Sequence, residues 1–342
     1  MSYMKIDCIF TIDYEIYGNG EGSLQDLVFE PARELLRIFQ KHEAKLVFFV
    51  EVSELEMIER AGADEAVGRV KQQVRECYHS GHEVALHLHP QWYNARRESG
   101  RWVLDYQEYN LCTLPRERID EIVTRGIDYL RNAVGDNTFG PVSFRAGNWL
   151  FQPTATAANV LAAHGIKIDS SVFKGGLQHK QSLDYRRARR NGDYWLFGDD
   201  VNVPDPAGAM FEIPIHTEMV PFWRMVTKKR VGLQKKGYSA GQSGKARFAR
   251  MRDFARLLHP LKFDFCRMTF DELVGMTERV IAQHRRSNTY KPMVAIGHTK
   301  DLVDFDTVEK FLSYLSEKDV SVNTLEGAYQ RCQPVSSPLG IA

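Results

Sequence analysis

Short apolar runs alternate with amphipathic segments along most of the chain. The runs are rich in β-branched residues and apolar at consecutive positions, which is typical of strands covered on both faces. We predict a strand in each of eight segments: residues 7–13, 46–50, 83–88, 142–145, 166–172, 211–215, 293–297 and 320–324.

Several segments between these strands repeat apolar residues at the spacing of one helix face. One helix is expected after Pro31, because proline suits a first helical turn. Two further starts have the pattern of a capping box, in which a hydroxyl and a glutamate three residues later bind each other's backbone N–H. These are Ser53 with Glu56 and Thr269 with Glu272. The apolar stripes lie at 35–39, 119–130, 273–281 and 308–315.

The alternation of strands and helices predicts an α/β fold with a parallel sheet. Seven or eight such units predict a closed or nearly closed (β/α) barrel, whose active site lies at the C-terminal ends of the strands. The pattern becomes irregular from about 174 to 265. We interpret this stretch as an insertion within a single domain that spans residues 1–342.

The overall charge changes the range of expected partners. The 342 residues include 45 Lys and Arg against 44 Asp and Glu, a net charge of +1. This balance argues against a nucleic-acid-binding protein.

No run of eighteen apolar residues occurs and the N-terminus is unlike a signal peptide, so we expect no transmembrane segment. The five cysteines form no Cys-x-x-Cys pair, and we expect a reducing, cytoplasmic location.

One local charge imbalance stands out. Residues 224–262 contain twelve Lys and Arg and one acid, Asp253. Such a stretch can face a nucleotide-sugar phosphate, a lipid-linked saccharide or the inner membrane surface. It can equally be the solvated face of a helix, which is the commoner case.

The first candidate residues for chemistry end the first predicted strand. Asp13 and Glu15 are two residues apart, so they share a face if the strand continues that far. Two carboxylates at a strand end can divide the work of holding a metal and accepting a proton. The alternative is that Asp13 caps the next helix and Glu15 is a solvated loop residue.

A pair of histidines ends the third predicted strand. His87 and His89 are also two residues apart, so both imidazoles point the same way and can give one metal two nitrogen ligands. The alternative is a pair of hydrogen-bonded surface histidines. A metal site is favoured, because paired histidines at a strand end are rarely packing residues.

Two further strand ends carry single candidates. Arg145 can hold a carboxylate or a substrate oxygen, or it can belong to a structural ion pair. His298 can act as a general acid, because the pKa of histidine lies near neutrality, or it can be a capping or buried histidine. The joint placement of all these residues at the ends of four strands predicts one shared pocket.

The order of these motifs resembles the polysaccharide deacetylase superfamily, also known as the NodB-homology or carbohydrate esterase family four superfamily. The resemblance covers residues 8 to about 300, and residues 87–92 are most similar to a branch linked to lipopolysaccharide biosynthesis, the WbmS- and WalW-like proteins. It implies a seven-stranded, distorted TIM-like barrel. The motifs are TIDYE (11–15), GHEVALHLHP (81–90), FRAGNW (144–149), IDSSV (168–172) and IGHT (296–299).

The resemblance also implies roles for individual residues. Asp13 would be the catalytic base, Arg145 would orient it, and His298 would be the acid. The metal, expected to be zinc, would be held by Glu15, His87 and His89. We further expect substrate contacts from Tyr14, Trp92, Asn148, Trp149, Asp169 and Ser170.

The sequence departs from the family pattern at three places. Tyr14 follows Asp13 where the family usually has a second aspartate, the two histidines are closer together than usual, and no proline follows Arg145. An exchange of roles between Asp13 and Glu15 therefore stays open.

We accordingly predict that the protein uses a metal to remove an N-acyl group from a sugar or polysaccharide, and we expect this group to be N-acetyl. The reaction would serve surface-polysaccharide (lipopolysaccharide O-antigen) biosynthesis. The carbohydrate substrate would be free, nucleotide-linked or lipid-linked. One alternative is a metal phosphoesterase, although that class favours a His-x-His pair on the first strand. The other is a glycan-binding barrel without catalytic activity.

Overall fold

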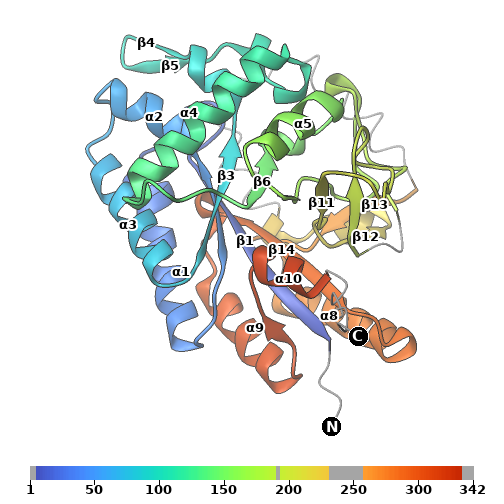
Figure 1. Ribbon diagram of the computed structural model, residues 1–342. Helices are drawn as coiled ribbons and strands as arrows, with labels where there is room; N and C mark the ends of the chain where they lie inside the picture. The colour runs from blue at the N-terminus through green and yellow to red at the C-terminus, as the bar shows by residue number, and fades with distance from the viewer. Residues whose placement is uncertain (1–4, 190–192, 231–256, 333–342) are drawn as a thin grey trace, which may run out of the picture.

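A curled, mostly parallel sheet forms the centre of the protein (Figure 1). The computed structural model describes residues 5–189, 193–230 and 257–332. Along the sheet, seven successive strands from β11 to β14 run parallel, in the order β11-β7-β6-β3-β2-β1-β14. Their bounds are β1 (Ile6–Tyr14), β2 (Val47–Glu51), β3 (Glu83–Leu88), β6 (Ser143–Ala146), β7 (Ile168–Asp169), β11 (Met210–Glu212) and β14 (Lys291–His298).

Two short strands extend this sheet. β15 (Ser321–Val322) pairs in parallel with β1, and β10 (Trp195–Phe197) pairs antiparallel with β11. Beyond β11, Ile215 forms isolated parallel bridges to Phe173 and to Val294 of β14. These bridges bring the two ends of the sheet together, so the fold is the distorted barrel that the sequence predicts.

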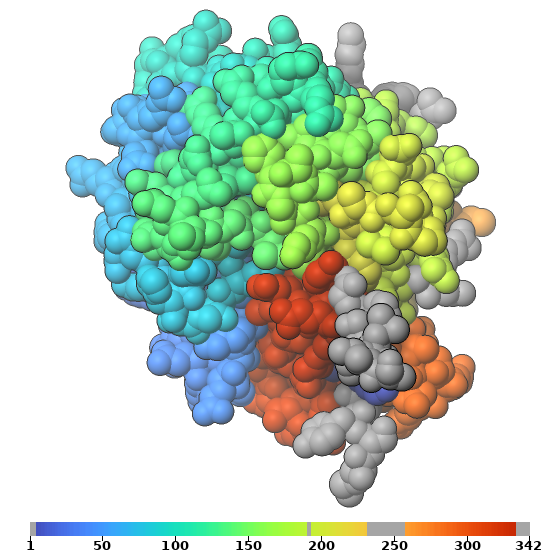
Figure 2. Space-filling view, viewed as in Figure 1, coloured from blue at the N-terminus to red at the C-terminus, as the bar shows by residue number. Residues whose placement is uncertain are grey.

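Helices cover the outer face of the sheet. In the space-filling view, α1 from the N-terminal part and α9 from the C-terminal part lie side by side (Figure 2), and Lys41 and Glu309 form an ion pair between them. Within the described residues, no helix is long and apolar enough to cross a bilayer. The helices are α1 (Glu30–Lys41), α2 (Val52–Arg60), α3 (Val67–His79), α4 (Arg116–Val134), α5 (Ala155–Ala163), α8 (Phe270–Ser287), α9 (Phe305–Glu317) and α10 (Leu325–Cys332).

One of the two predicted capping boxes is present. Thr269 accepts a hydrogen bond from the N–H of Glu272, whose side chain accepts from the N–H of Thr269 at the start of α8. The box predicted at Ser53 is wrong. The N-cap of α2 is Glu51, the last residue of β2 and two residues before Ser53. The carboxylate of Glu51 accepts the N–H of Glu54, and Ser53 lies inside the first turn of the helix.

The predicted strand at 166–172 is shorter than expected. β7 ends at Asp169, because two carboxylates take the next backbone N–H groups from the sheet. Asp169 accepts the N–H of Ser171 at 3.1 Å, and Glu212 accepts that of Val172 at 3.2 Å. The chain therefore leaves the sheet at the end where the candidate site lies.

The stretch from 174 to 265 contains only short elements in its described part. Besides β10 and β11, its strands are β8 (Leu177–Gln178), β9 (Leu183–Asp184), β12 (Thr217–Val220) and β13 (His259–Lys262), and its 3-10 helices are His179–Gln181 and Phe222–Met225. Most of the basic stretch, residues 231–256, lies outside the described residues. Two of its described cations are paired: Lys229 Nζ lies 2.9 Å from Asp304, and Arg230 lies 2.6 Å from Glu272.

Candidate active site

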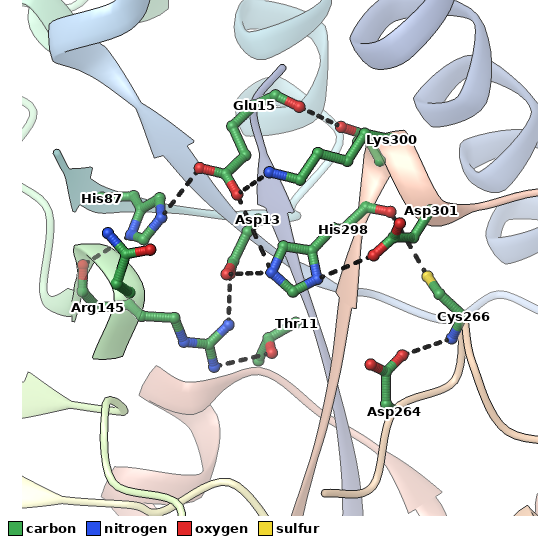
Figure 3. Close-up of polar contacts among 12 residues, drawn as sticks. Thr11, Asp13, Glu15, His87, Arg145, Asp264, Cys266, His298, Lys300 and Asp301 are labelled. Carbon is green, nitrogen blue, oxygen red and sulfur yellow. Dashed lines mark hydrogen bonds and ion pairs between the residues drawn. The ribbon is translucent and has the colours of Figure 1, made fainter. Parts of the chain in front are cut away.

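The C-terminal ends of neighbouring strands bring the predicted catalytic residues together. In the register of β1 and β14, Asp13 is paired with His298. In that of β3 and β6, His87 is paired with Arg145. Figure 3 shows Asp13 between Arg145 and His298, with Glu15 above it and His87 alongside. The pairing of parallel strands thus fixes the positions of these side chains before any ligand is present.

Glu15 and the two histidines form a compact donor set. Glu15 Oε2 lies 3.1 Å from His89 Nε2 and 3.6 Å from His87 Nε2, and all three side chains are buried. One carboxylate and two imidazoles are the ligands of many catalytic metal sites, which leave further positions for water or substrate. The three ligand atoms lie close enough together to hold one ion. These residues therefore fit a divalent metal, although the geometry does not select zinc.

The outer nitrogen of His87 has a defined partner. His87 Nδ1 lies 2.8 Å from the backbone carbonyl of Arg145, which can only accept a hydrogen bond. The proton of a neutral His87 is thus held on Nδ1, and the lone pair of Nε2 points toward Glu15. Metal-binding histidines are commonly oriented by such a contact.

His89 is held by two amide side chains. Its Nδ1 lies 3.2 Å from the Gln91 amide and 3.3 Å from the Asn148 amide. Gln91 Oε1 is buried without a hydrogen-bond partner in the described structure. A half-turn of the Gln91 amide exchanges its oxygen and nitrogen, so that Oε1 can accept a hydrogen bond from His89 Nδ1–H. The other ring nitrogen of His89, Nε2, then has a lone pair free for a metal. Gln91 can therefore set which ring nitrogen of a neutral His89 carries the proton.

A glycine allows the chain to pass close to His89. A Cβ atom on Gly147 would lie 2.5 Å from the carbonyl oxygen of Leu88 and 2.9 Å from the His89 ring. A side chain at this position would displace either the strand end or the imidazole. Steric crowding by Leu88 and His89 thus explains why the FRAGNW motif has a glycine at position 147.

Asp13 is the most enclosed acid of the site. Its Oδ1 accepts a hydrogen bond from Arg145 Nη1 at 2.7 Å, and its Oδ2 lies 3.3 Å from His298 Nε2. Burial raises the pKa of Asp13, but Arg145 and the imidazoles of His87 and His298 outweigh this effect, so the net pKa lies below its ordinary value. Asp13 is therefore held as a carboxylate.

Arg145 is fully buried and all of its contacts are fixed. Its Nε donates to the carbonyl of Ser170 at 2.9 Å, and its Nη2 donates to Thr11 Oγ1 at 3.0 Å. The guanidinium also lies 4.1 Å from the centroid of the Phe49 ring. This network leaves the side chain one orientation, in which it faces Asp13.

His298 lies between two carboxylates. Its Nε2 faces Asp13, while its Nδ1 lies 3.9 Å from Asp301 Oδ2 and is buried without a hydrogen-bond partner in the described structure. Burial lowers the pKa of His298, and the attraction of Asp13 only partly opposes it, so the net pKa lies below the ordinary value. A protonated His298 is thus a strong proton donor at this position.

A lysine missed by the sequence analysis binds Glu15. Lys300 Nζ lies 2.7 Å from Glu15 Oε1, so one carboxylate oxygen is engaged and Oε2 remains toward the histidines. Burial raises the pKa of Glu15, but the opposite effect of Lys300 and His89 is larger. The net pKa of Glu15 therefore lies well below its ordinary value. Lys300 and Asp301 lie two and three residues after His298 in the chain, and this proximity is the signal that could have identified them.

Two of the predicted substrate contacts are core residues. Tyr14 has 0% of its surface exposed and donates a hydrogen bond from its hydroxyl to Gln73 Oε1 at 2.6 Å. Trp92 is 1% exposed and packs edge-on against Trp102. Their predicted contacts with a sugar ring are therefore wrong, because neither ring has a face open to a ligand.

Asp169 and Ser170 also have structural roles. Both are fully buried; Asp169 accepts from the Ser171 hydroxyl at 2.7 Å, and Ser170 holds Arg145 through its carbonyl. Direct contact of their side chains with substrate hydroxyls is thus not possible in this structure. Asn148 and Trp149 do border the site: both are half-buried, and the Trp149 ring lies edge-on to that of His298, with 6.0 Å between centroids.

Tyr109 is another residue at this border that the sequence analysis missed. It is half-buried, and its hydroxyl interacts with the side chain of Asn148. Burial and the negative charge of Glu15 contribute to raising its pKa to about 12, so it is a neutral hydrogen-bond donor. No motif in the sequence marks this tyrosine, which follows an irregular segment.

Comparisons with known proteins locate the fold. No protein-family profile and no curated protein matches the sequence. A Mycobacterium smegmatis protein, provisionally assigned as a polysaccharide deacetylase, superimposes with a TM-score of 0.52 over 96% of this chain and 90% of that one, at 16% identity. A Pseudomonas aeruginosa PAO1 protein with the same provisional assignment superimposes with a TM-score of 0.49 at 14% identity. The PuuE allantoinase superimposes with a TM-score of 0.48 at 13% identity. Each superposition covers 96% of this chain and 90% of the other.

The first of these similarities shows a shared fold, a curled and mostly parallel sheet of the kind found in that polysaccharide deacetylase-like structure. At 16% identity it carries no information on activity. The function has to be argued from the site itself.

Proposed function

We propose that the protein is a metal-dependent hydrolase that removes an N-acyl group, most simply N-acetyl, from a sugar. The observation that carries this proposal is the convergence of Glu15, His87 and His89 beside a second pair, Asp13 and His298. The first set can hold a metal and the second can move a proton. Both functions are needed for amide hydrolysis by water.

A divalent ion held by Glu15, His87 and His89 would polarise the acyl carbonyl and lower the pKa of a bound water. The chain's own residues supply the rest. Asp13 Oδ2 accepts the proton of the attacking water, while Arg145 fixes the other carboxylate oxygen. His298 Nε2, 3.3 Å from Oδ2, delivers a proton to the departing nitrogen. The backbone N–H groups near Asn148 are candidates to bind the oxyanion.

The identity of the substrate rests on the motif resemblance. The IDSSV and IGHT segments and the histidine pair support an N-acylated carbohydrate, and residues 87–92 support a role in lipopolysaccharide O-antigen assembly in the cytoplasm. Deletion of the gene followed by compositional analysis of the surface polysaccharide tests this role. An unchanged polysaccharide would contradict it.

Two other functions use the same residues differently. A metal phosphoesterase usually needs several more His or Asp ligands, and within the described residues the donor sets around this site are confined to Asp13, Glu15, His87, His89 and His298. A glycan-binding barrel without activity would have no use for a carboxylate and a histidine aligned for proton transfer. The geometry therefore favours the hydrolase.

The first test is activity with and without the metal. We expect the purified protein to release acetate from N-acetylated sugars, to lose this activity on treatment with a chelator, and to regain it when a divalent ion is added. A chelator acts because the three ligands alone cannot polarise the carbonyl as a cation does. Acetate is measured with an enzyme-coupled assay, and metal content by mass spectrometry.

The control is the His89→Gln variant, which should neither retain the metal nor regain activity. Acetate release that is unaffected by complete metal removal would contradict the proposed mechanism. Phosphate release from phosphorylated sugars, without acetate release, would favour the phosphoesterase.

A further inference from the structure

Lys262 lies beside the candidate active site without having been assigned any role in it. It is the last residue of β13, and its Nζ lies 3.1 Å from the centroid of the Trp149 ring and 4.8 Å from that of Phe173. The same Trp149 ring contacts the imidazole of His298 edge-on. One aromatic ring therefore connects the ammonium group of Lys262 to the proton-transfer pair.

No carboxylate of the described residues forms an ion pair with Lys262. Asp264, two residues further along, is engaged elsewhere: its Oδ1 accepts the backbone N–H groups of Cys266 and Arg267, each at 3.1 Å. The side chain of Arg267 is likewise directed to Asp301, at 2.9 Å. Asp264, the acid nearest to Lys262 in the chain, thus binds the local turn and forms no ion pair with the ammonium group.

An ammonium group that loses water without gaining an acid is costly for the fold. Burial lowers the pKa of Lys262 to about 7, although the negative charge of Asp264 opposes the change. The Trp149 face attracts the cation, but an aromatic ring accepts none of its three hydrogen bonds as a carboxylate would. Lys262 and Trp149 are each half-buried as whole residues, so neither residue is sealed from solvent. Fold stability alone does not explain a lysine here.

A second donor at the same ring also lacks a partner. Trp149 Nε1 is buried and makes no hydrogen bond in the described structure. The region around this ring therefore offers positive charge and an N–H group, and Asp13, Glu15 and Asp301 are each held by a cation of the protein. An incoming negative charge would find Lys262 as the cation without a carboxylate partner.

We propose that Lys262 binds an anionic group of the substrate, a carboxylate or a phosphate carried by the N-acylated sugar. This inference rests on the proposed function and narrows its substrate class to acidic sugars. A neutral sugar leaves the ammonium group unpaired, whereas an anion supplies a charge-assisted hydrogen bond. Such a bond corresponds to a preference of about ten- to a hundredfold in kcat/KM.

The test compares three sugars and three variants. The sugars are N-acetylglucosamine, its 1-phosphate and the matching N-acetylated uronic acid, so the last two distinguish a phosphate from a carboxylate. The variants are Lys262→Met, Lys262→Arg and, as a control, Lys310→Met on the exposed face of α9. We expect Lys262→Met to lose the preference for one of the acidic sugars, so that the ratio of its kcat/KM values for that sugar and for N-acetylglucosamine falls by about ten- to a hundredfold. Lys262→Arg should keep part of the preference, and Lys310→Met all of it.

Binding is measured separately by calorimetry, with the Asp13→Asn variant in the presence and absence of the Lys262→Met change. This measurement reports on Lys262 even if no sugar is hydrolysed, so a failure of the proposed function is distinguishable from a failure of this inference. Equal affinity for acidic and neutral sugars would overturn the inference. An equal loss of affinity for both kinds of sugar in the Lys262→Met variant would overturn it as well. Thermal unfolding verifies that each variant is folded.

Discussion

Replacing Asp13 with asparagine is expected to lower kcat for deacylation by about 10²- to 10⁴-fold, the usual contribution of a general base. Asparagine keeps an oxygen that can accept the hydrogen bond from Arg145 Nη1 but cannot take a proton from water. The fold and the metal should both be retained, because the proposed metal ligands are Glu15, His87 and His89. Acetate release and metal content, measured on the same preparation, examine this expectation.

The matched control for this change is Asp128→Asn, which alters an exposed aspartate on α4. It should leave kcat and metal content unchanged. A preparation of Asp13→Asn that loses its metal would show that Asp13, and not Glu15, is the carboxylate ligand. Full activity in Asp13→Asn would remove Asp13 from the chemistry altogether.

Replacing Arg145 with methionine is expected to have the largest effect on stability. The change leaves Asp13 as a buried carboxylate without its cation and frees the acceptors Thr11 Oγ1 and the Ser170 carbonyl. Loss of one partner of a buried ion pair costs about 3–5 kcal/mol of unfolding free energy. Denaturant unfolding followed by circular dichroism measures this loss, and activity should fall as Asp13 loses its fixed orientation.

Two further variants separate charge from geometry. Arg145→Lys keeps the charge but has no planar fork to reach Asp13, Thr11 and Ser170 together, so it should be intermediate in stability. Arg96→Met removes an exposed arginine from β4 (Arg96–Glu98) and should have little effect. Stability of Arg145→Met equal to that of the unchanged protein would mean that the buried pair does not support the fold.

The parallel sheet and the positions of the main site residues were predictable from the sequence. The runs at 7–13, 83–88 and 293–297 are rich in apolar residues, and each has a polar residue at its last position or just after it: Asp13, His89 and His298. Strand identity and strand end could therefore be inferred together. The site then follows from a property of all parallel barrels, whose C-terminal strand ends face one pocket. The grouping of Asp13, His87 and His298 was inferred from their joint placement at strand ends, and their roles from the family resemblance.

The prediction for Tyr14 failed for a reason that the same pattern contains. Side chains alternate along a strand, so the face shared by Asp13 and Glu15 excludes the residue between them. Tyr14 accordingly points away from the site, to Gln73 of α3.

Other parts of the site depend on long-range contacts that no local pattern encodes. Lys300 reaches Glu15 across 285 positions of sequence, and Lys262 reaches Trp149 from β13, a short strand within the stretch whose sequence pattern is irregular. The weak strand at 166–172 likewise ended early because of Glu212, a residue on another strand. Charge pairing between distant segments therefore set the details that the sequence analysis missed.

The proposed function requires one cation to bind between Glu15, His87 and His89. Anomalous diffraction at the zinc edge from crystals soaked with zinc measures this most directly. We expect a single strong peak within coordination distance of Glu15 Oε2, His87 Nε2 and His89 Nε2. A zinc peak bound by Asp13 and His298 would contradict this expectation. So would a fully occupied zinc site elsewhere in the protein while His87 and His89 bind no metal.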